Sequence, residues 1–275
     1  PLPGGVVVRV AASHLRVGTF ELLASRGDQA GLQALTTYAL GRHYPDAVGA
    51  VNEPLALLER VVAAQASLVA RWLGLGFIHG VMNTDNTSIS GETIDYGPCA
   101  FLDEYVPQKT FSSIDRGGRY AYANQPRMAL WNVTRLAETL IPLIDPEQGR
   151  AVAMATEQLD RFAELFGEAH SRVLHAKAGL EREEDGDVKL LQTLLDRMAS
   201  GEVDFTRFRR VNPAFIPRNH RVEQLITAAV RQGDFGPFEA FHRVLARPYD
   251  DQPESASWAE PPAREERVQA TFCGT

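Results

Sequence analysis

Two oxygen-bearing side chains that could hold a divalent metal ion, Asn86 and Asp95, stand nine residues apart in a segment rich in glycine, threonine and serine. Amide and carboxylate oxygens are the ligands that Mg²⁺ takes in proteins, together with phosphate oxygens of a nucleotide. A further carboxylate, Asp85, directly precedes Asn86. Asn and Asp are also common in turns, where their side chains bond the nearby backbone. Taken singly, each residue fits turn chemistry, so the surrounding pattern has to decide.

That pattern resembles the catalytic and metal-binding loops of a protein kinase. Kinases carry H-x-D-x-x-x-x-N and then D-F-G, where the Asn and the second Asp hold magnesium and the first Asp accepts the substrate proton. His79 and Asn86 keep the spacing of the first motif, and Asp95 begins a D-Y-G in place of the second. The proton-accepting position is Val81, which cannot accept a proton. The pattern therefore indicates a metal site without the usual base, with His79 supporting the loop through a hydrogen bond.

A longer stretch resembles the selenoprotein O family of kinase-like protein adenylyltransferases. It is G-F-I-H-G-V-M-N-T-D-N-T-S-I-S-G-E-T-I-D-Y-G-P-C-A-F-L-D-E-Y, residues 76–105. Further segments resemble family motifs in the same order, namely R-V-A-A-S-H-L-R-V-G-T-F-E (9–21), G-R-Y-A-Y (118–122), N-Q-P (124–126), L-W-N (130–132) and N-P-A-F-I-P-R-N-H (212–220). Chance does not account for so many motifs in order across nearly the whole chain.

The resemblance implies a function and a set of site residues. The function is transfer of AMP from ATP to Ser, Thr or Tyr hydroxyls of proteins, with Mg²⁺, or alternatively Mn²⁺, as the ion. It implies that Asn86 and Asp95 are metal ligands and that Asp85 is the catalytic acid–base residue. Arg9 and Arg16 are implied to contact the phosphates of ATP, so they form the nucleotide-binding set together with Asp95.

The residues alone leave some of these roles open. Arg9 and Arg16 are seven positions apart, which puts them on one side of a helix but on opposite sides of a strand. Their alternative role is a surface ion pair, although a guanidinium fork is well suited to phosphate. For Asp85 the alternative is a turn or helix cap beside a true ligand.

Two features depart from the family pattern. The family's glycine-rich loop and ATP-binding lysine lie upstream of R-V-A-x-S-H, and this chain begins only eight residues before Arg9. Family members with a regulatory disulfide carry one cysteine in the loop after D-Y-G-P, where this chain has Phe111, and one near the C-terminus. Cys99 is the nearest substitute and Cys273 stands near the C-terminus. Whether they pair is left open, the alternative being an inert thiol on the tail.

Composition narrows the function classes. The chain has 275 residues, of which 44% are hydrophobic, enough to build a substantial core in one or two domains. A net charge of −7 argues against a nucleic-acid binder. No run approaches the ~18 consecutive apolar residues of a membrane span, and no leader peptide is recognisable. Two cysteines suit a reducing compartment. We expect a cytoplasmic protein that binds ATP and protein substrates, but neither nucleic acid nor membrane.

Helical periodicity dominates the chain. Apolar residues recur at helical spacing from Leu55 to Leu73 and the pattern ends at Gly74 and Gly76, which predicts a long buried helix leading to the His79 loop. Further helices are predicted at 127–140, 147–178, 188–198, 222–231 and 237–246.

Three shorter segments carry the remaining predictions. Residues 6–10 form a β-branched run typical of a strand. Thr19 is expected to cap the helix that follows. Residues 89–101 are rich in Gly, Thr and β-branched residues, which favours a short β hairpin carrying Asp95.

Together these observations predict an α+β, predominantly helical chain with a protein-kinase-like fold, mainly its C-terminal lobe with a helical C-terminal extension. Residues 1–249 are expected to form the lobe and extension, and 250–275 a mobile tail rich in Pro, Glu, Ser and Ala. The predicted function is that of a protein adenylyltransferase. Two alternatives are an atypical kinase that uses Asp85 as its base and an inactive nucleotide-binding scaffold lacking the N-terminal half.

Overall fold

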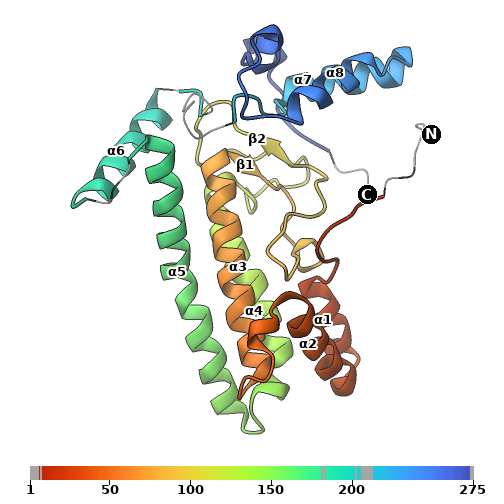
Figure 1. Cartoon of the computed structure of the whole chain (residues 1–275), viewed down its shortest axis with the longest axis vertical. Helices are drawn as coiled ribbons and strands as arrows, with labels where there is room; N and C mark the ends of the chain where they lie inside the picture. Colours follow the sequence, from red (N-terminus) through yellow and green to blue (C-terminus); the bar gives the residue numbers. More distant parts are fainter. Residues whose placement is uncertain are drawn as a thin grey trace.

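A computed structural model describes residues 6, 8–180, 182, 184–201, 203–205 and 213–272. Its elements confirm an α+β, mostly helical chain with one small sheet (Figure 1). The α-helices are α1 (Val17–Ser25), α2 (Gln29–His43), α3 (Glu53–Leu75), α4 (Gln125–Ile144), α5 (Gln148–Ala178), α6 (Asp187–Ser200), α7 (Asn219–Thr227) and α8 (Gly236–Leu245). The strands are β1 (Phe77–Ile78) and β2 (Ala100–Phe101).

Helix α3 is the central element, and it confirms the long buried helix predicted from the apolar periodicity. Asn52 caps its start, since Asn52 Oδ1 accepts from the Leu55 N–H at 3.1 Å. Gly76 ends it in the left-handed conformation at φ 73°, where an added Cβ would come within 2.8 Å of Phe205. The helix therefore stops at a defined residue, directly before β1.

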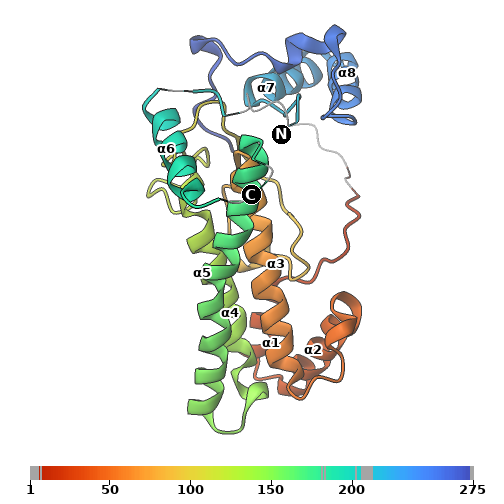
Figure 2. The ribbon, with the colours of Figure 1, turned by 60° about the vertical axis from the view of Figure 1, so that its left-hand side comes forward.

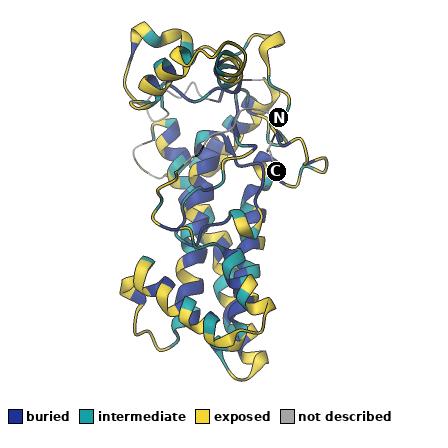
Figure 3. Ribbon diagram, turned by 90° about the vertical axis from the view of Figure 1, so that its right-hand side faces the viewer, coloured by how far each residue is buried: buried dark blue, intermediate teal, exposed yellow. Residues whose placement is uncertain are grey.

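Three long helices, α3, α4 and α5, lie side by side along the molecule, as both ribbon views show (Figures 1 and 2). Their facing sides are buried, whereas the outward sides are exposed (Figure 3). Leu57, Leu58 and Val61 of α3 and Leu136 and Leu140 of α4 are fully buried in one cluster. Burying one such side chain contributes about 1.5–3 kcal/mol, so this bundle supplies the rigid base for the loops above it. None of the described helices is both long enough and apolar enough to cross a membrane.

The prediction of a hairpin within residues 89–101 was wrong, because β2, the only strand in that fully described segment, pairs with β1. Strand β2 pairs antiparallel with β1, Phe77 opposite Phe101 and Ile78 opposite Ala100, so Asp95 lies in the long loop between the strands. Gly91 in this loop has φ 71°, and Ile89 and Ile94 are buried without pairing to each other's segment in a hairpin. Burial of these two side chains, together with side-chain hydrogen bonds to the loop, replaces the local pairing that the composition suggested.

The predictions for the N-terminal segment also need correction. Residues 8–10 form no strand; Val8 and Val10 are 83% and 93% exposed, and no described neighbour pairs with them. Helix α1 begins two residues before Thr19. Thr19 instead lies in the first turn, where its Oγ1 accepts from the Arg16 N–H at 3.2 Å.

The C-terminal part carries α6, α7 and α8. Helix α7 begins earlier than the predicted 222, and a π-helical turn (Ala228–Gln232) extends it. The segment predicted to be a mobile tail packs on α8. Trp258 stacks on Phe241 with ring centroids 4.7 Å apart, and Gln252 Nε2 donates to the Val244 carbonyl at 3.1 Å. The proposed domain boundary at 249/250 stays a prediction. Cys273 lies outside the described residues.

Candidate active site

His79 connects the two halves of the predicted metal site. Its fully buried ring donates from Nε2 to the Ile94 carbonyl at 2.7 Å, and Nδ1 accepts from the Val81 N–H at 3.4 Å. A carbonyl can only accept, so these bonds define the neutral tautomer with hydrogen on Nε2. Burial lowers the pKa of His79, which favours the same neutral form. The expected supporting hydrogen bond is confirmed, and it reaches the residue just before Asp95.

Asn86 ends a short 3-10 helix, Thr84–Asn86, that begins after Asn83. Its Nδ2 donates to the Val81 carbonyl at 3.2 Å, and its backbone N–H donates to the Asn83 carbonyl at 3.0 Å. These bonds fix the direction of the side-chain amide. Asn86 Oδ1, the atom that a metal ion would bind, accepts no hydrogen bond within the described part of the chain.

Asp95 lies between two arginines. Arg16 has a guanidinium nitrogen 2.9 Å from Asp95 Oδ2, and Arg9 has one 3.7 Å from Oδ1. Oδ2 makes no aligned hydrogen bond with any described residue, so the Arg16 contact is an ion pair without hydrogen-bond geometry. Asp95 also has φ 55°, the only positive φ outside glycine among the described residues, a conformation that Asp tolerates better than most residues. The structure thus brings all three members of the predicted nucleotide-binding set together.

A backbone pairing places Arg16 beside the metal loop. The Val17 N–H donates to the Thr87 carbonyl at 3.0 Å, and the Ile89 N–H donates to the Leu15 carbonyl at 3.1 Å. This antiparallel bridge lays residues 15–17 along residues 87–89, directly after Asn86. The two arginines therefore reach Asp95 from an irregular segment, neither a helix nor a strand, which is why their spacing left the question open.

Asp85 stands next to the start of α1 and is exposed. A Cβ added to Gly18 would lie 3.3 Å from both Asp85 Cα and Asp85 N, so only glycine lets α1 approach this closely. The Asp85 carboxylate has no hydrogen bond or ion pair with the described residues, and the 3-10 helix has no side-chain cap. The geometry thus gives no support to a capping role; its role in catalysis stays a prediction.

Three side chains that sequence reasoning did not single out hold the loop in place. Gln125 accepts from the His79 N–H at 3.0 Å and donates to the Phe77 carbonyl at 2.9 Å. Asn132 Nδ2 donates to the Met82 carbonyl at 3.0 Å, and Tyr120 Oη donates to Asn83 Oδ1 at 2.7 Å. Their signal was available, because they belong to the N-Q-P, L-W-N and G-R-Y-A-Y motifs.

Cys99 is free and only partly exposed. Burial raises the pKa of its thiol to about 11, which disfavours the reactive thiolate at neutral pH. Its pairing with Cys273 stays a prediction. At Phe111, the backbone carbonyl accepts from the Thr271 N–H at 2.6 Å, so the end of the described chain runs beside that loop.

The donor set suits a hard cation that also binds a nucleotide. A free amide oxygen on Asn86 and the carboxylate of Asp95 are the oxygen ligands that Mg²⁺ takes, and phosphates and water complete such sites. No group of three or more His, Cys, Asp or Glu arranged for a metal occurs in the described part of the chain. None of the five predicted site residues lines the cavities formed by residues 102–111 and 261–269, by α5 and α6, or by α7 and its π-helical turn. The site is open, with the Arg16 and Asp95 side chains about one-third exposed.

Comparison with known proteins supplies the family. The family model for protein adenylyltransferase SelO matches residues 1–210. Protein nucleotidyltransferase YdiU of Bradyrhizobium sp. (strain ORS 278) is 49% identical, with 100% of this chain and 66% of the relative aligned. The YdiU proteins of Rhizobium etli and Methylorubrum extorquens are each 50% identical, again over 100% of this chain, and over 65% and 67% of their own lengths. The chain spans about two thirds of the length of the curated relatives it matches. These matches show that the chain belongs to the SelO family of protein adenylyltransferases.

Proposed function

We propose that this chain carries the metal-binding and catalytic loops of a protein adenylyltransferase with a protein-kinase-like fold. The reaction is transfer of AMP from ATP to Ser, Thr or Tyr hydroxyls of protein substrates. One observation carries the proposal: Arg9 and Arg16 converge on Asp95, in a chain of the SelO family. A cytoplasmic location is part of the proposal, because a chain with two cysteines suits a reducing compartment.

Asn86 and Asp95 would hold Mg²⁺, or Mn²⁺ in its place. When bound, the ion neutralises negative charge on the triphosphate. The arginines pair with Asp95 in the described structure. When ATP binds, they can turn to its phosphates, where guanidinium groups stabilise the charge that develops in the transition state. Asp95 thereby becomes available as a ligand.

Asp85 takes the proton of the attacking hydroxyl. It is exposed beside Asn86, and its carboxylate is not engaged by the described residues. The hydroxyl oxygen forms a bond to the α-phosphorus, the bond from the α-phosphorus to the bridging oxygen breaks, and pyrophosphate leaves. Val81 is buried and apolar at the position of the kinase base, which argues against transfer of the γ-phosphate.

Labelled ATP tests the proposal. The complete protein is incubated with a mixed protein substrate and ATP that carries label on either the α- or the γ-phosphate. Label from the α position alone is expected on protein. Label from the γ position would favour an atypical kinase that uses Asp85, and ATP binding without any transfer would favour a scaffold.

A further inference from the structure

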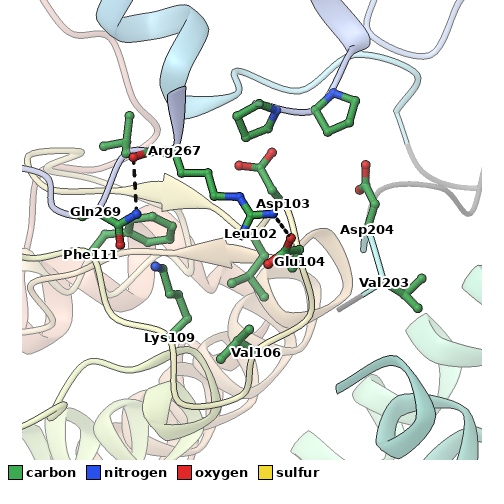
Figure 4. Close-up of a pocket in the computed structure, with 13 residues that line it drawn as sticks. Leu102, Asp103, Glu104, Val106, Lys109, Phe111, Val203, Asp204, Arg267 and Gln269 are labelled. Carbon is green, nitrogen blue, oxygen red and sulfur yellow. Dashed lines mark hydrogen bonds and ion pairs between the residues drawn. The ribbon is translucent and has the colours of Figure 1, made fainter. Parts of the chain in front are cut away.

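A cavity in the described part of the chain is lined by none of the five predicted site residues. It has a volume of about 500 Å³. Its walls come from residues 102–111 after β2, from residues 203–204, and from residues 261–269 (Figure 4). The last wall belongs to residues 260–272, which we call the C-terminal strap.

Backbone hydrogen bonds hold these walls in place. The Tyr105 N–H donates to the Val203 carbonyl at 3.1 Å, and the Phe205 N–H donates to the Asp103 carbonyl at 2.8 Å. On the other side, the Ser113 N–H donates to the Thr271 carbonyl at 3.0 Å. The cavity is therefore preformed, as ligand sites commonly are.

The C-terminal strap also connects this cavity to the candidate active site. Thr271 Oγ1 donates to the carbonyl of Pro98, the last residue of the D-Y-G-P that begins at Asp95. The opposite wall begins at Leu102, the residue directly after β2. A molecule in the cavity thus contacts segments that continue from the metal loop.

The carboxylates around the cavity are already paired. Arg218, whose side chain is 4% exposed, forms ion pairs with Asp103 at 2.5 Å and Asp204 at 3.1 Å. Glu104 pairs with Arg267 at 2.5 Å, across the cavity in Figure 4. None of these carboxylates is a free anion waiting for a cationic ligand.

Lys109 differs from these charged residues because it forms no ion pair with the described residues. Its Nζ lies 4.7 Å from the ring centroid of Phe111, and no carboxylate of the described residues comes within ion-pair distance. Apolar side chains, including Val106, Pro261 and Pro262, line the same cavity. Among the described residues, the cavity accordingly offers one cation outside the ion pairs together with apolar wall residues, which is complementary to an anion with an apolar body.

We propose that this cavity is a docking subsite for the protein substrate, taking a segment in which an acidic side chain is flanked by apolar ones. This inference rests on the proposed function. The size of the electrostatic gain favours a protein segment over a small anion as the occupant. A single ion pair at a partly exposed lysine improves affinity by about fivefold at most, which is too little to retain a free small anion. The same gain is useful for a protein that is also held at the active site, because the two contacts act together.

The direct test measures binding without ATP, on the complete protein. Three short fluorescent peptides share one apolar sequence and carry Glu, Gln or Lys at the central position. By fluorescence anisotropy, the Glu peptide should bind about fivefold more tightly than the Gln peptide, and the Lys peptide should bind most weakly. Lys109→Met, which keeps the stem on Phe111, should remove the difference, and Lys109→Arg should keep it. Lys189→Met, at an exposed lysine on α6 that does not line the cavity, is the matched control and should behave like the parent.

A kinetic arm uses the same peptides with a Ser added as acceptor. Lys109→Met should raise KM for the Glu peptide about fivefold, leave kcat unchanged, and alter neither constant for the Gln peptide. Thermal unfolding of each variant checks that the fold is intact. Glu preference that persists in Lys109→Met, or no preference in the parent, would overturn the subsite. Because binding is measured without transfer, failure of the adenylyltransferase reaction would be seen separately.

Discussion

At the scale of single residues, the central feature of the site is the negative charge of one carboxylate and the positive groups that compensate it. Asp95 faces two guanidinium groups in the described structure and is the predicted ligand of a divalent cation. Both the arginine pairs and a bound cation would supply a positive charge next to the Asp95 carboxylate, so the carboxylate has a counter-charge with or without the metal. His79 holds the preceding carbonyl and so limits how far Asp95 can move between the two arrangements.

Replacing a metal ligand should weaken binding of the metal–nucleotide complex. Asp95→Ala should lower the affinity of the complete protein for ATP with Mg²⁺ by at least about 100-fold, because even outer-shell partners of metals cost about 10–100-fold. Asn86→Ala should have a smaller effect. Isothermal titration calorimetry measures both, with Asp160→Ala on the exposed side of α5 as control. Unchanged affinity in Asp95→Ala would remove the metal assignment.

Loss of Asp85 should affect transfer and spare binding. Asp85→Ala is expected to slow single-turnover transfer of α-label by about 10²–10⁴-fold, the usual contribution of a general base. Affinity for ATP should stay within error of the parent, because the carboxylate is not placed as a ligand. An Asp85→Ala enzyme with full activity would show that the residue is not the base.

At the scale of elements, the site depends on how α1 and the segment before it lie on the metal loop. Residues 15–17 pair with 87–89, and Gly18 brings the first turn of α1 against the Asp85 backbone. Helices α3 and α4 also fix the loop, since Gln65 of α3 and Gln125 and Asn132 of α4 bond its backbone. The loop is therefore held by long-range contacts on two sides.

Adding one methyl group at the contact of α1 should disturb this arrangement. Gly18→Ala places a Cβ 3.3 Å from backbone atoms of Asp85, so the 3-10 helix must shift by a few tenths of an ångström. We expect transfer to fall about tenfold, given that a 1 Å misplacement can cost about 10²-fold. Gly41→Ala in α2 is the matched control, because nothing lies within 4 Å of its Cβ. It should keep full activity and gain about 0.5–1 kcal/mol of stability from helix propensity. Equal activity in both variants would contradict the close contact.

Lys177 at the end of α5 should make stability depend on pH. Burial lowers the pKa of Lys177 to about 7, and its Nζ donates to the Gly74 carbonyl near the end of α3. Above pH 7 the unfolded chain keeps a proton that the folded chain has lost, so the free energy of unfolding should rise with pH. The free-energy cost of burying the Lys177 amine is largest below about pH 7 and vanishes above about pH 10.

Urea unfolding at pH 7 and pH 9 tests this sign. Lys177→Met should flatten the rise between the two values, and Lys189→Met, at an exposed lysine, should leave it unchanged. The window stops at pH 9 because the raised thiol pKa of Cys99 acts in the opposite direction above it. A parent chain whose stability falls from pH 7 to pH 9 would contradict the assignment.

At the scale of the whole molecule, the open site predicts weak nucleotide binding by these 275 residues alone. The Arg16 and Asp95 side chains are about one-third exposed. In high dielectric their contacts with phosphate are screened. Calorimetry should therefore find ATP bound much more weakly by this chain than by the complete protein, and more weakly still as salt is raised. Tight Mg²⁺-dependent binding by a monomer of this chain would contradict the prediction.

Local patterns were sufficient for part of this molecule. The periodicity from Leu55 to Leu73 specified α3 because the spacing of apolar residues along a helix is a local property. The same holds for the other long helices, whose bounds differ from the predictions at their ends, where capping and tertiary contacts decide. Motifs in order also identified the family and the candidate residues Asp85, Asn86 and Asp95 without any coordinates.

Only the tertiary structure decided how these parts meet. Arg9 and Arg16 belong to an irregular segment, so no spacing rule could place them on Asp95; a backbone pairing to residues 87–89 does so. Strand β2 pairs with β1 rather than within 89–101, and Ile89 and Ile94 are buried in the loop between the strands. Composition made residues 250–266 resemble a mobile tail, yet residues of this segment pack on α8. In the first two cases the deciding contact joins residues far apart in the chain, and a local reading of the sequence does not contain that pairing. In the third case the packing of individual side chains decides, which composition does not encode.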